Sequence, residues 1–218
     1  MDDKLVDKFV TGLKAGASLV SAGGSFVELV TSIIPNQRIE RIVTFLKRLD
    51  DRVEHLEEKE ARRFHERKIN PEYVALFEDG AFHAARSSSE DRIKYISSAV
   101  INGMTSEHRS AVEARHLLGL LNEINDIEIV WLCHFSHKRG FGVSDEYYEK
   151  HYDLLKPISR ERGQPDEVYD AAALQDSYKE HLARLKLISS ANENYHATTL
   201  GKMVLRLAGL VSVENTNL

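Results

Sequence analysis

Arg109 and His116 form the pair of residues in this chain that comes closest to catalytic chemistry. On one helix, a guanidinium and an imidazole at this spacing can stabilise charge and move a proton on a phosphodiester, as cleavage of RNA requires. Arg48 and His55 share the spacing. A chain of this Arg and His content contains on the order of two such pairs by chance. We therefore expect no enzyme, and we keep Arg109 with His116 as remote candidates for a helical ribonuclease.

Four neighbouring side chains offer the sulfur and nitrogen donors that zinc prefers, namely Cys133, His134, His137 and His151. Their spacing fits no standard zinc finger. A cysteine at the end of an apolar run is more often a small buried side chain, so we expect Cys133 to pack in the core. No glycine-rich phosphate loop or nucleophile elbow accompanies these residues. We predict neither a metal site nor a cofactor.

Three basic residues, Lys179, Arg184 and Lys186, would face DNA if residues 174–187 formed the recognition helix of a winged helix. The first half of that segment should then carry the residues that contact the bases, but it contains Asp176, whose charge repels phosphates. DNA binding is therefore our alternative interpretation. A protein contact, or a purely structural role, is the preferred one.

The composition is that of a soluble helical protein, with 42% hydrophobic and 29% charged residues over 218 positions. The formal net charge of −5 excludes a general electrostatic affinity for nucleic acid. The single cysteine excludes a framework of disulfides within the chain and fits a reducing compartment. The start Met1-Asp2-Asp3 is acidic where a secretory signal would be basic, so we expect a cytoplasmic protein.

Residues 5–34 form an apolar segment with little charge, and between residues 15 and 34 the only ionisable side chain is Glu28. About 20 residues is the length that spans a bilayer, although several hydroxyl side chains make this segment only modestly apolar. We expect a helix that is either packed in a bundle or released to meet a membrane. The residues assigned to this packing or membrane role are Gly12, Gly16, Val20, Phe26 and Val30.

The next segment, after Pro35, carries apolar residues at the a and d positions of three heptads, a pattern typical of a coiled coil. Arg52 and Glu57 would then pair across two parallel helices, and we expect the helix to continue, solvated, to Lys68. The predicted oligomerisation seam consists of Ile39, Ile42, Leu46, Leu49, Val53 and Leu56.

The middle of the chain predicts a series of helices with recognisable start signals. Asn70-Pro71 is typical of a helix start, and Ser87 with Glu90 has the spacing of a capping box. Residues 127–135 are rich in β-branched side chains, yet we favour a helix there. Residues 188–195 favour a short β-hairpin, followed by a helix that starts near Thr198.

The segment from Leu182 to Ile188, a polar turn with Tyr195, and then Thr198-Thr199-Leu200-Gly201 resembles the closing half of bacterial winged-helix domains. Upstream, residues 89–96 and residues 120–126 resemble the middle of bacterial abortive-infection (antiphage) helical proteins that end in such a wing. The likeness covers residues 72–210. It implies a family of non-enzymatic or unassigned defence proteins, whose variable N-terminal segments are suspected of membrane contact.

Taken together, these observations predict an all-α protein with a small β wing. We divide it into an N-terminal helical hairpin with the heptad seam (1–69), a central helical bundle (70–137) and a winged-helix-like module (138–218). The leading hypothesis is a non-enzymatic antiphage component that forms homo-oligomers and acts on membranes when activated. The module at the C-terminal end would contact a protein partner. The alternative is a winged-helix transcriptional regulator that binds DNA.

Overall fold

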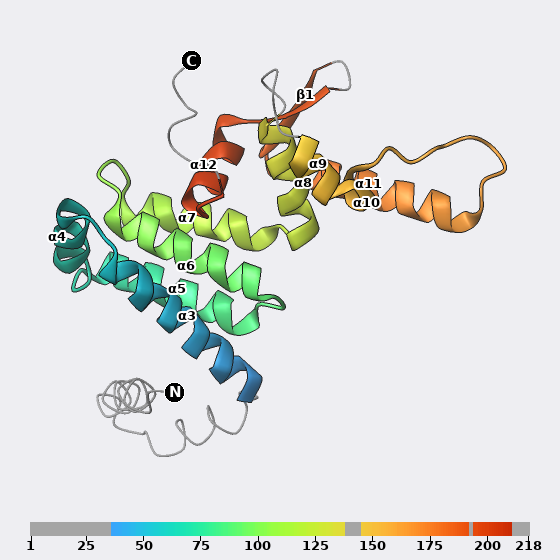
Figure 1. The fold of residues 1–218 in the computed structure, drawn as a ribbon. Coiled ribbons are helices and arrows are strands. Elements are labelled where there is room, and N and C mark those ends of the chain that lie inside the picture. The colour runs from blue at the N-terminus through green and yellow to red at the C-terminus, as the bar shows by residue number, and fades with distance from the viewer. Residues whose placement is uncertain (1–35, 138–144, 192–193, 211–218) are drawn as a thin grey trace.

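A computed structural model describes residues 36–137, 145–191 and 194–210 of the chain. Most of these residues are helical, and the described part contains ten helices and one two-stranded sheet (Figure 1). The helices are α3 (Asn36–Glu54), α4 (Glu58–Arg67), α5 (Pro71–Arg86), α6 (Glu90–Thr105), α7 (Ala111–Glu123), α8 (Asp126–His137), α9 (Asp145–Lys150), α10 (Tyr152–Leu155), α11 (Asp166–Arg184) and α12 (Thr199–Leu207). The strands are β1 (Ile188–Ala191) and β2 (Asn194–Ala197).

The prediction of a mostly helical fold with a small β element is confirmed. Residues 127–135 lie in α8, so the preference for a helix over a strand there is correct. Strands β1 and β2 form the predicted hairpin and pair antiparallel, with Ile188 opposite Ala197. Thr198 caps α12 because its side chain accepts a hydrogen bond from the backbone N–H of Gly201.

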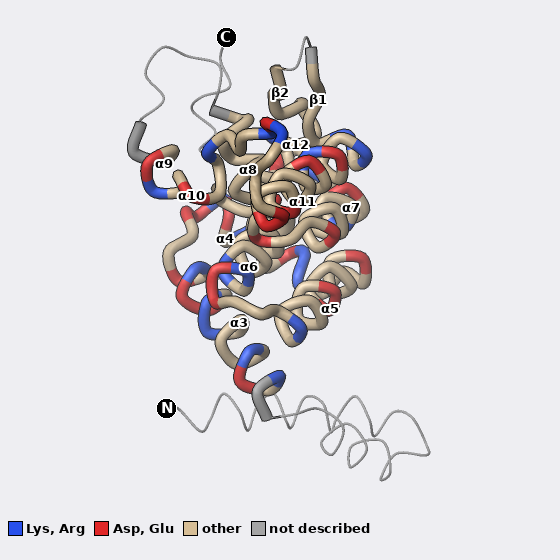
Figure 2. The backbone as a smooth tube through the Cα atoms, turned by 90° about the vertical axis from the view of Figure 1, so that its right-hand side faces the viewer, with Lys and Arg blue, Asp and Glu red and all other residues tan. Residues whose placement is uncertain are grey.

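Helix α3 lies against α5 and α6 and contributes the fully buried Phe45 to their interface. The ring of Phe45 lies 5.9 Å from that of Phe77, measured between ring centroids. Gly80 allows this close approach, since a Cβ atom there would lie 2.5 Å from Val100 and 3.2 Å from Phe45. The first turns of α3 extend beyond the rest of the described bundle (Figures 1 and 2).

The expectation of one helix continuing to Lys68 is wrong. Helix α3 ends at Glu54, and α4 begins at Glu58 after a short link. Glu57 caps α4 in a capping box with Glu60, because each residue's carboxylate accepts a hydrogen bond from the other's backbone N–H.

Two arginines explain why the charged segment folds back instead of extending into solvent. The Nε atom of Arg63 donates to the carbonyl of Thr105 at 2.7 Å. Arg67 donates from Nη1 to the carbonyls of Met104 at 3.1 Å and Ser106 at 2.7 Å. These carbonyls end α6 and have no partner within that helix, so the two cations cap its negative C-terminal end.

One of the helix starts differs from the predicted one. Asn70 caps α5 as expected, with Pro71 in the first turn. The cap of α6, however, is Ser89 and not Ser87, whose hydroxyl donates to the carbonyl of His83. A capping box of Ser110 with Glu113 starts α7. Three serines, Ser87, Ser88 and Ser89, stand in a row before α6, and pattern alone did not separate these capping candidates.

One cluster of buried side chains extends from α3 to α12, across the predicted divisions at residues 69/70 and 137/138. Helix α12 packs on α7 and α6. The side chain of Asn102, on α6, accepts a hydrogen bond from Arg52 on α3 and donates to the carbonyls of Arg206 and Leu207 at the end of α12. The described elements therefore share their packing and their hydrogen bonds.

Residues of both charge signs occur along α3, α6 and α7, as the coloured tube in Figure 2 shows. Among the described helices, none combines the length and the apolar character that a membrane span requires.

Candidate functional site

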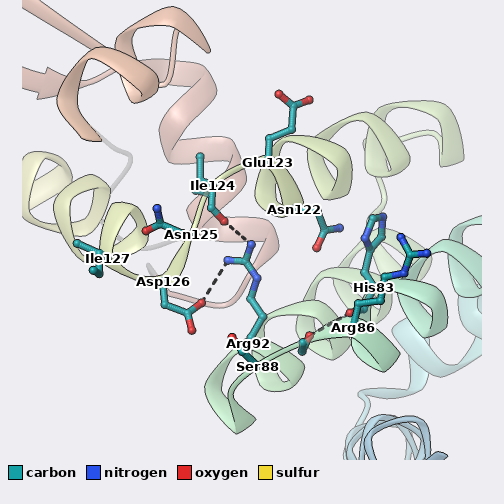
Figure 3. Close-up of a pocket in the computed structure, with 11 residues that line it drawn as sticks. His83, Arg86, Ser88, Arg92, Asn122, Glu123, Ile124, Asn125, Asp126 and Ile127 are labelled. Atoms are coloured by element: carbon teal, nitrogen blue, oxygen red, sulfur yellow. Dashed lines mark hydrogen bonds and ion pairs between the residues drawn. The ribbon is translucent and has the colours of Figure 1, made fainter. Parts of the chain in front are cut away.

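A cleft lies where the loop between α5 and α6, the end of α7 and the start of α8 meet (Figure 3). Its volume is about 590 Å³. Helix α5 contributes His83 and Arg86, α6 contributes Arg92, and the α7–α8 link contributes Ile124 and Asn125. The sequence analysis assigned no function to any of these residues.

Arg92 forms the floor of this cleft, and only 9% of its surface is exposed. Its Nη2 atom donates hydrogen bonds to the carbonyls of Leu121, at 2.8 Å, and Ile124. Its Nη1 atom lies 3.5 Å from a carboxylate oxygen of Asp126. Burial lowers the pKa of Arg92, and the charges of Asp126 and Glu128 oppose that shift. The guanidinium therefore binds carbonyls at the end of α7 and a carboxylate at the start of α8 at the same time.

Ser89 adds a second connection between these helices. Its hydroxyl accepts the backbone N–H of Arg92 at 3.1 Å, which caps α6, and donates to the carboxylate of Asp126 at 2.7 Å. A carboxylate at the first residue of α8 is favoured by the positive end of the helix dipole. The side chains of Ser89, Arg92 and Asp126 thus join the start of α6, the end of α7 and the start of α8.

The opposite rim of the cleft carries His83 and Arg86 (Figure 3). Burial lowers the pKa of His83, and the charges of Arg86 and Arg92 lower it further, against the opposing effect of Asp79. The guanidinium of Arg86 lies 4.0 Å from the ring centroid of Phe82. This rim thus offers a neutral imidazole, that of His83, and one exposed cation, that of Arg86. The buried polar groups of the cleft therefore hold helix ends together.

A buried carboxylate, Glu128, holds a histidine on the other side of α8. One carboxylate oxygen accepts the backbone N–H of Asn125 at 2.7 Å, and the other lies 2.7 Å from Nδ1 of His181 on α11. The side chain of Glu128 is 4% exposed and that of His181 is 24% exposed. A pocket of about 440 Å³, which Ser177 and Arg184 also line, borders this pair.

The geometry of the Glu128–His181 pair suits orientation of an imidazole for proton transfer. Nucleophilic catalysis of the Ser–His type would need, in addition, a nucleophile within hydrogen-bond distance of that imidazole. Ser177 lies one helical turn before His181, but no hydrogen bond joins the two side chains within the described residues. The pair connects α8 to α11, as Arg92 connects α6 to α7 and α8.

The predicted heptad seam divides into two parts in the structure. Leu49 is buried, and the side chains of Leu46, Val53 and Leu56 pack against the core of the same chain. Ile39, near the start of α3, is 36% exposed. Ile42, one turn later, is half-buried.

The expected pair between Arg52 and Glu57 of two chains does not fit this arrangement. Arg52 donates to the side chains of Ser98, at 2.7 Å, and Asn102, at 3.2 Å, within its own chain. Glu57 lies beyond the end of α3, where it caps α4. The heptad frame is interrupted between them.

The remote ribonuclease residues are not brought together. Arg109 is half-buried in the link before α7, and His116 is exposed on that helix. Burial and the charge of Arg206 lower the pKa of Arg109. In the described part of the chain, no hydrogen bond or ring contact joins Arg109 to His116.

The basic residues of the DNA alternative point to different environments. The ammonium of Lys179 lies 4.7 Å from the ring centroid of Trp131. Arg184 is exposed at the end of α11, and Lys186 is exposed in the turn that follows, with a positive φ of 58°. Asp176 forms an ion pair with Arg160 at 2.6 Å. Lys179 thus lies against α8, whereas Arg184 and Lys186 lie at the end of α11 and in the turn that follows.

Cys133 is buried, as expected from its position at the end of an apolar run. Burial raises its pKa to about 11, against the effect of a hydrogen bond with Tyr147. Burial also raises the pKa of Tyr147. Among the residues that the structure describes, no three His, Cys, Asp or Glu side chains are placed to hold a metal ion.

The predicted packing or membrane residues, Gly12, Gly16, Val20, Phe26 and Val30, lie outside the described residues. The polar networks around Arg92 and Glu128 were missed by the sequence reasoning. A signal for Glu128 was present, because it is the one acidic residue inside the apolar run 127–135. Arg92 stands beside Ile93 in a charged stretch, and nothing in the pattern marked its burial.

Comparison of this chain with protein families, with curated proteins and with solved structures finds no match.

Proposed function

We propose that this protein is a non-enzymatic bacterial defence component of the abortive-infection type, which self-associates through its N-terminal part and acts on membranes. The observation that carries the proposal is the position of Ile39. It is 36% exposed in the first turns of α3, five residues after the end of the apolar segment 5–34. An apolar side chain at this place can be covered by a second copy.

The division of the heptad seam supports a narrower association surface than the full pattern suggested. Leu49 and its neighbours already pack inside the chain. The part of the seam that remains for a second copy is the start of α3, with Ile39 and Ile42. These residues follow the apolar residues 15–34, whose only ionisable side chain is Glu28, after a short polar stretch at residues 35–38.

A membrane role for residues 5–34 rests on their composition. An apolar helix loosened by glycines can be stored against protein and released to a lipid surface by a trigger. In this proposal the protein is cytoplasmic at rest and reaches the membrane when activated.

The non-enzymatic part of the proposal is supported by the roles of the buried polar groups. Arg92 binds the carbonyls that end α7, and Glu128 binds the backbone at the start of α8 and His181. These groups are engaged in joining helices. The winged-helix-like module of the proposal is the unit α11, β1, β2 and α12, in which a hairpin follows one helix and precedes another. It would contact a protein partner.

Sedimentation of the full chain tests self-association. We expect the wild-type protein to sediment above the mass of one chain, 24.7 kDa, and the variant Ile39→Asp to shift toward that mass. The matched control is Val112→Asp, because Val112 is an apolar side chain that is 65% exposed on α7. A wild-type monomer, or an equal effect of the two variants, would contradict the proposal.

A further inference from the structure

Four arginines, Arg38, Arg41, Arg48 and Arg52, form an arginine stripe along one face of α3. Their separations in the sequence are those that return a side chain to the same face of a helix. The buried Phe45 lies on the same line, so the stripe runs along the side of α3 that packs against the bundle.

The second half of the stripe is used inside the molecule. A guanidinium nitrogen of Arg48 lies 3.5 Å from a carboxylate oxygen of Glu90, the first residue of α6. Arg52, one turn further, donates to the side chains of Ser98 and Asn102 on the same helix. Helix α6 therefore supplies acceptors for the stripe from its first residue onward.

The first half of the stripe extends past the start of α6. Arg41 and Arg38 lie about two and three turns before Arg48, and α6 has no residue before Glu90 to meet them. Arg38 is exposed and Arg41 is half-buried. Within the described residues, neither guanidinium forms a hydrogen bond or an ion pair. These are the turns of α3 that protrude from the bundle in Figures 1 and 2.

The first half of α3 differs in charge from the chain as a whole. Residues 36–48 carry four cations and one carboxylate, Glu40, whereas the chain has a formal net charge of −5. Each residue turns a helix by about 100°, so the side chain of Glu40 leaves α3 on the side opposite Arg38. An acidic protein is repelled by an anionic surface unless a local cationic patch meets that surface first. The protruding turns of α3 are such a patch.

We propose that Arg38 and Arg41 contact the headgroups of anionic phospholipids when the protein is at a membrane. This inference rests on the membrane action proposed above, and it names the lipid class. The apolar residues 15–34 end four positions before Arg38. Cations that follow an apolar segment extend their charged ends to the headgroup level of a bilayer, and each strengthens binding to an anionic surface by about fivefold.

The self-association residue Ile39 points in a different direction from Arg41. The two residues are two positions apart, so their side chains leave α3 on nearly opposite sides. A second copy that covers Ile39 therefore leaves Arg41 accessible to lipid. The two contacts can exist together at the start of α3.

Sedimentation with sucrose-loaded vesicles tests the lipid class on the full chain. One set of vesicles is phosphatidylcholine alone, and the other contains phosphatidylserine as about one lipid in three. We expect partition to be at least about tenfold stronger with phosphatidylserine, and we expect most of this difference to disappear at about 0.5 M salt. Because any stored form opens by the same equilibrium in both sets, the ratio of the two partition coefficients reports the headgroup preference.

Two double substitutions locate the charge. Arg38→Gln with Arg41→Gln should weaken binding to the phosphatidylserine vesicles by about twentyfold and leave binding to phosphatidylcholine unchanged within about twofold. Arg38→Lys with Arg41→Lys keeps both charges and should retain the preference. The matched control is Lys59→Gln with Lys68→Gln, which removes two exposed cations of the α4 region and should weaken binding by less than about threefold.

Equal binding of the wild-type protein to both vesicle sets would overturn this inference and leave membrane action itself standing. Absence of binding to either set would contradict membrane action, and this inference would fall with it. The mass of the double glutamine variant in buffer separates lipid from protein contacts. A smaller particle than the wild-type one, without vesicles, would assign the two arginines to a second copy and would also overturn the inference.

Discussion

Nδ1 of His181 lies 2.7 Å from Oε1 of Glu128, and this contact joins two helices that are 53 residues apart at these positions. Since the Glu128 side chain is 4% exposed, its carboxylate depends on protein partners in place of water. The pair therefore contributes to the docking of α11 on α8.

Removal of this partner should destabilise the fold. We expect His181→Ala to lower the free energy of unfolding by about 1–3 kcal/mol, because one oxygen of a buried carboxylate loses its hydrogen bond. His116→Ala should change it by less than about 0.5 kcal/mol, since His116 is exposed on α7. Urea denaturation of both variants measures the difference. Equal stability of the two variants would show that the contact has no structural weight.

Arg92→Ala should be among the most destabilising substitutions in this protein. It leaves the carbonyls of Leu121 and Ile124 without their donor and Asp126 without its cation, which we expect to cost about 2–4 kcal/mol. Arg86→Ala is the control from the rim of the same cleft, and it should change stability by less than about 1 kcal/mol. A ranking in the reverse order, measured by thermal unfolding, would contradict the role assigned to Arg92.

Two helix glycines should respond in opposite directions to alanine. In Gly201→Ala, the new Cβ would lie 2.2 Å from the carbonyl oxygen of Leu187, so α12 must move away from the chain before β1. We expect a loss of more than about 2 kcal/mol. In Gly119→Ala, nothing lies within 4 Å of the new Cβ, and helix propensity should add about 0.5–1 kcal/mol. Denaturant midpoints of the two variants give the sign of each effect, and a stabilised Gly201→Ala would refute the packing of α12.

Cys133 should be chemically protected in the folded protein. Burial raises its pKa to about 11, so little thiolate is present at pH 8 and a thiol reagent should react only when the fold opens. Because the folded state favours the neutral thiol, Cys133 also makes stability depend on pH. Its contribution to the free energy of unfolding is complete below the pKa of the thiol in the unfolded chain, and it is lost as the pH rises toward 11.

The measurement is the rate of reaction with 5,5′-dithiobis(2-nitrobenzoic acid) at pH 8, with and without urea. We expect the rate in buffer to be at least about a hundredfold lower than in urea. In Cys133→Ala, the decline of stability between pH 8 and pH 10 should be smaller than in the wild-type protein. Rapid labelling of the native protein would contradict the burial of this thiol.

Much of the helical architecture could be predicted because it depends on local signals. The Asn70-Pro71 start, the hairpin after Ile188 and the Thr198 cap each need only a few adjacent residues. The end of α3 at Glu54 could not be predicted in this way. It depends on Arg63 and Arg67 reaching the end of α6, a contact between segments about 40 residues apart, which pattern reading does not see.

The heptad pattern illustrates a second limit. An apolar residue every three or four positions is required equally by a coiled coil between chains and by a helix packed in its own bundle. Leu49 shows the second use in this protein, since it is buried against the same chain. The networks of Arg92 and Glu128 were missed for a related reason, because a charged residue is expected at the surface unless its buried partners are known.

The mass of the full chain in solution, measured with and without lipid vesicles, tests the central proposal most directly. We expect more than one chain per particle in buffer. Since the stored and the released form are in equilibrium, we also expect transfer of a fraction of the protein to vesicles when they are added. A particle of 24.7 kDa that stays free of the vesicles would contradict both self-association and membrane action.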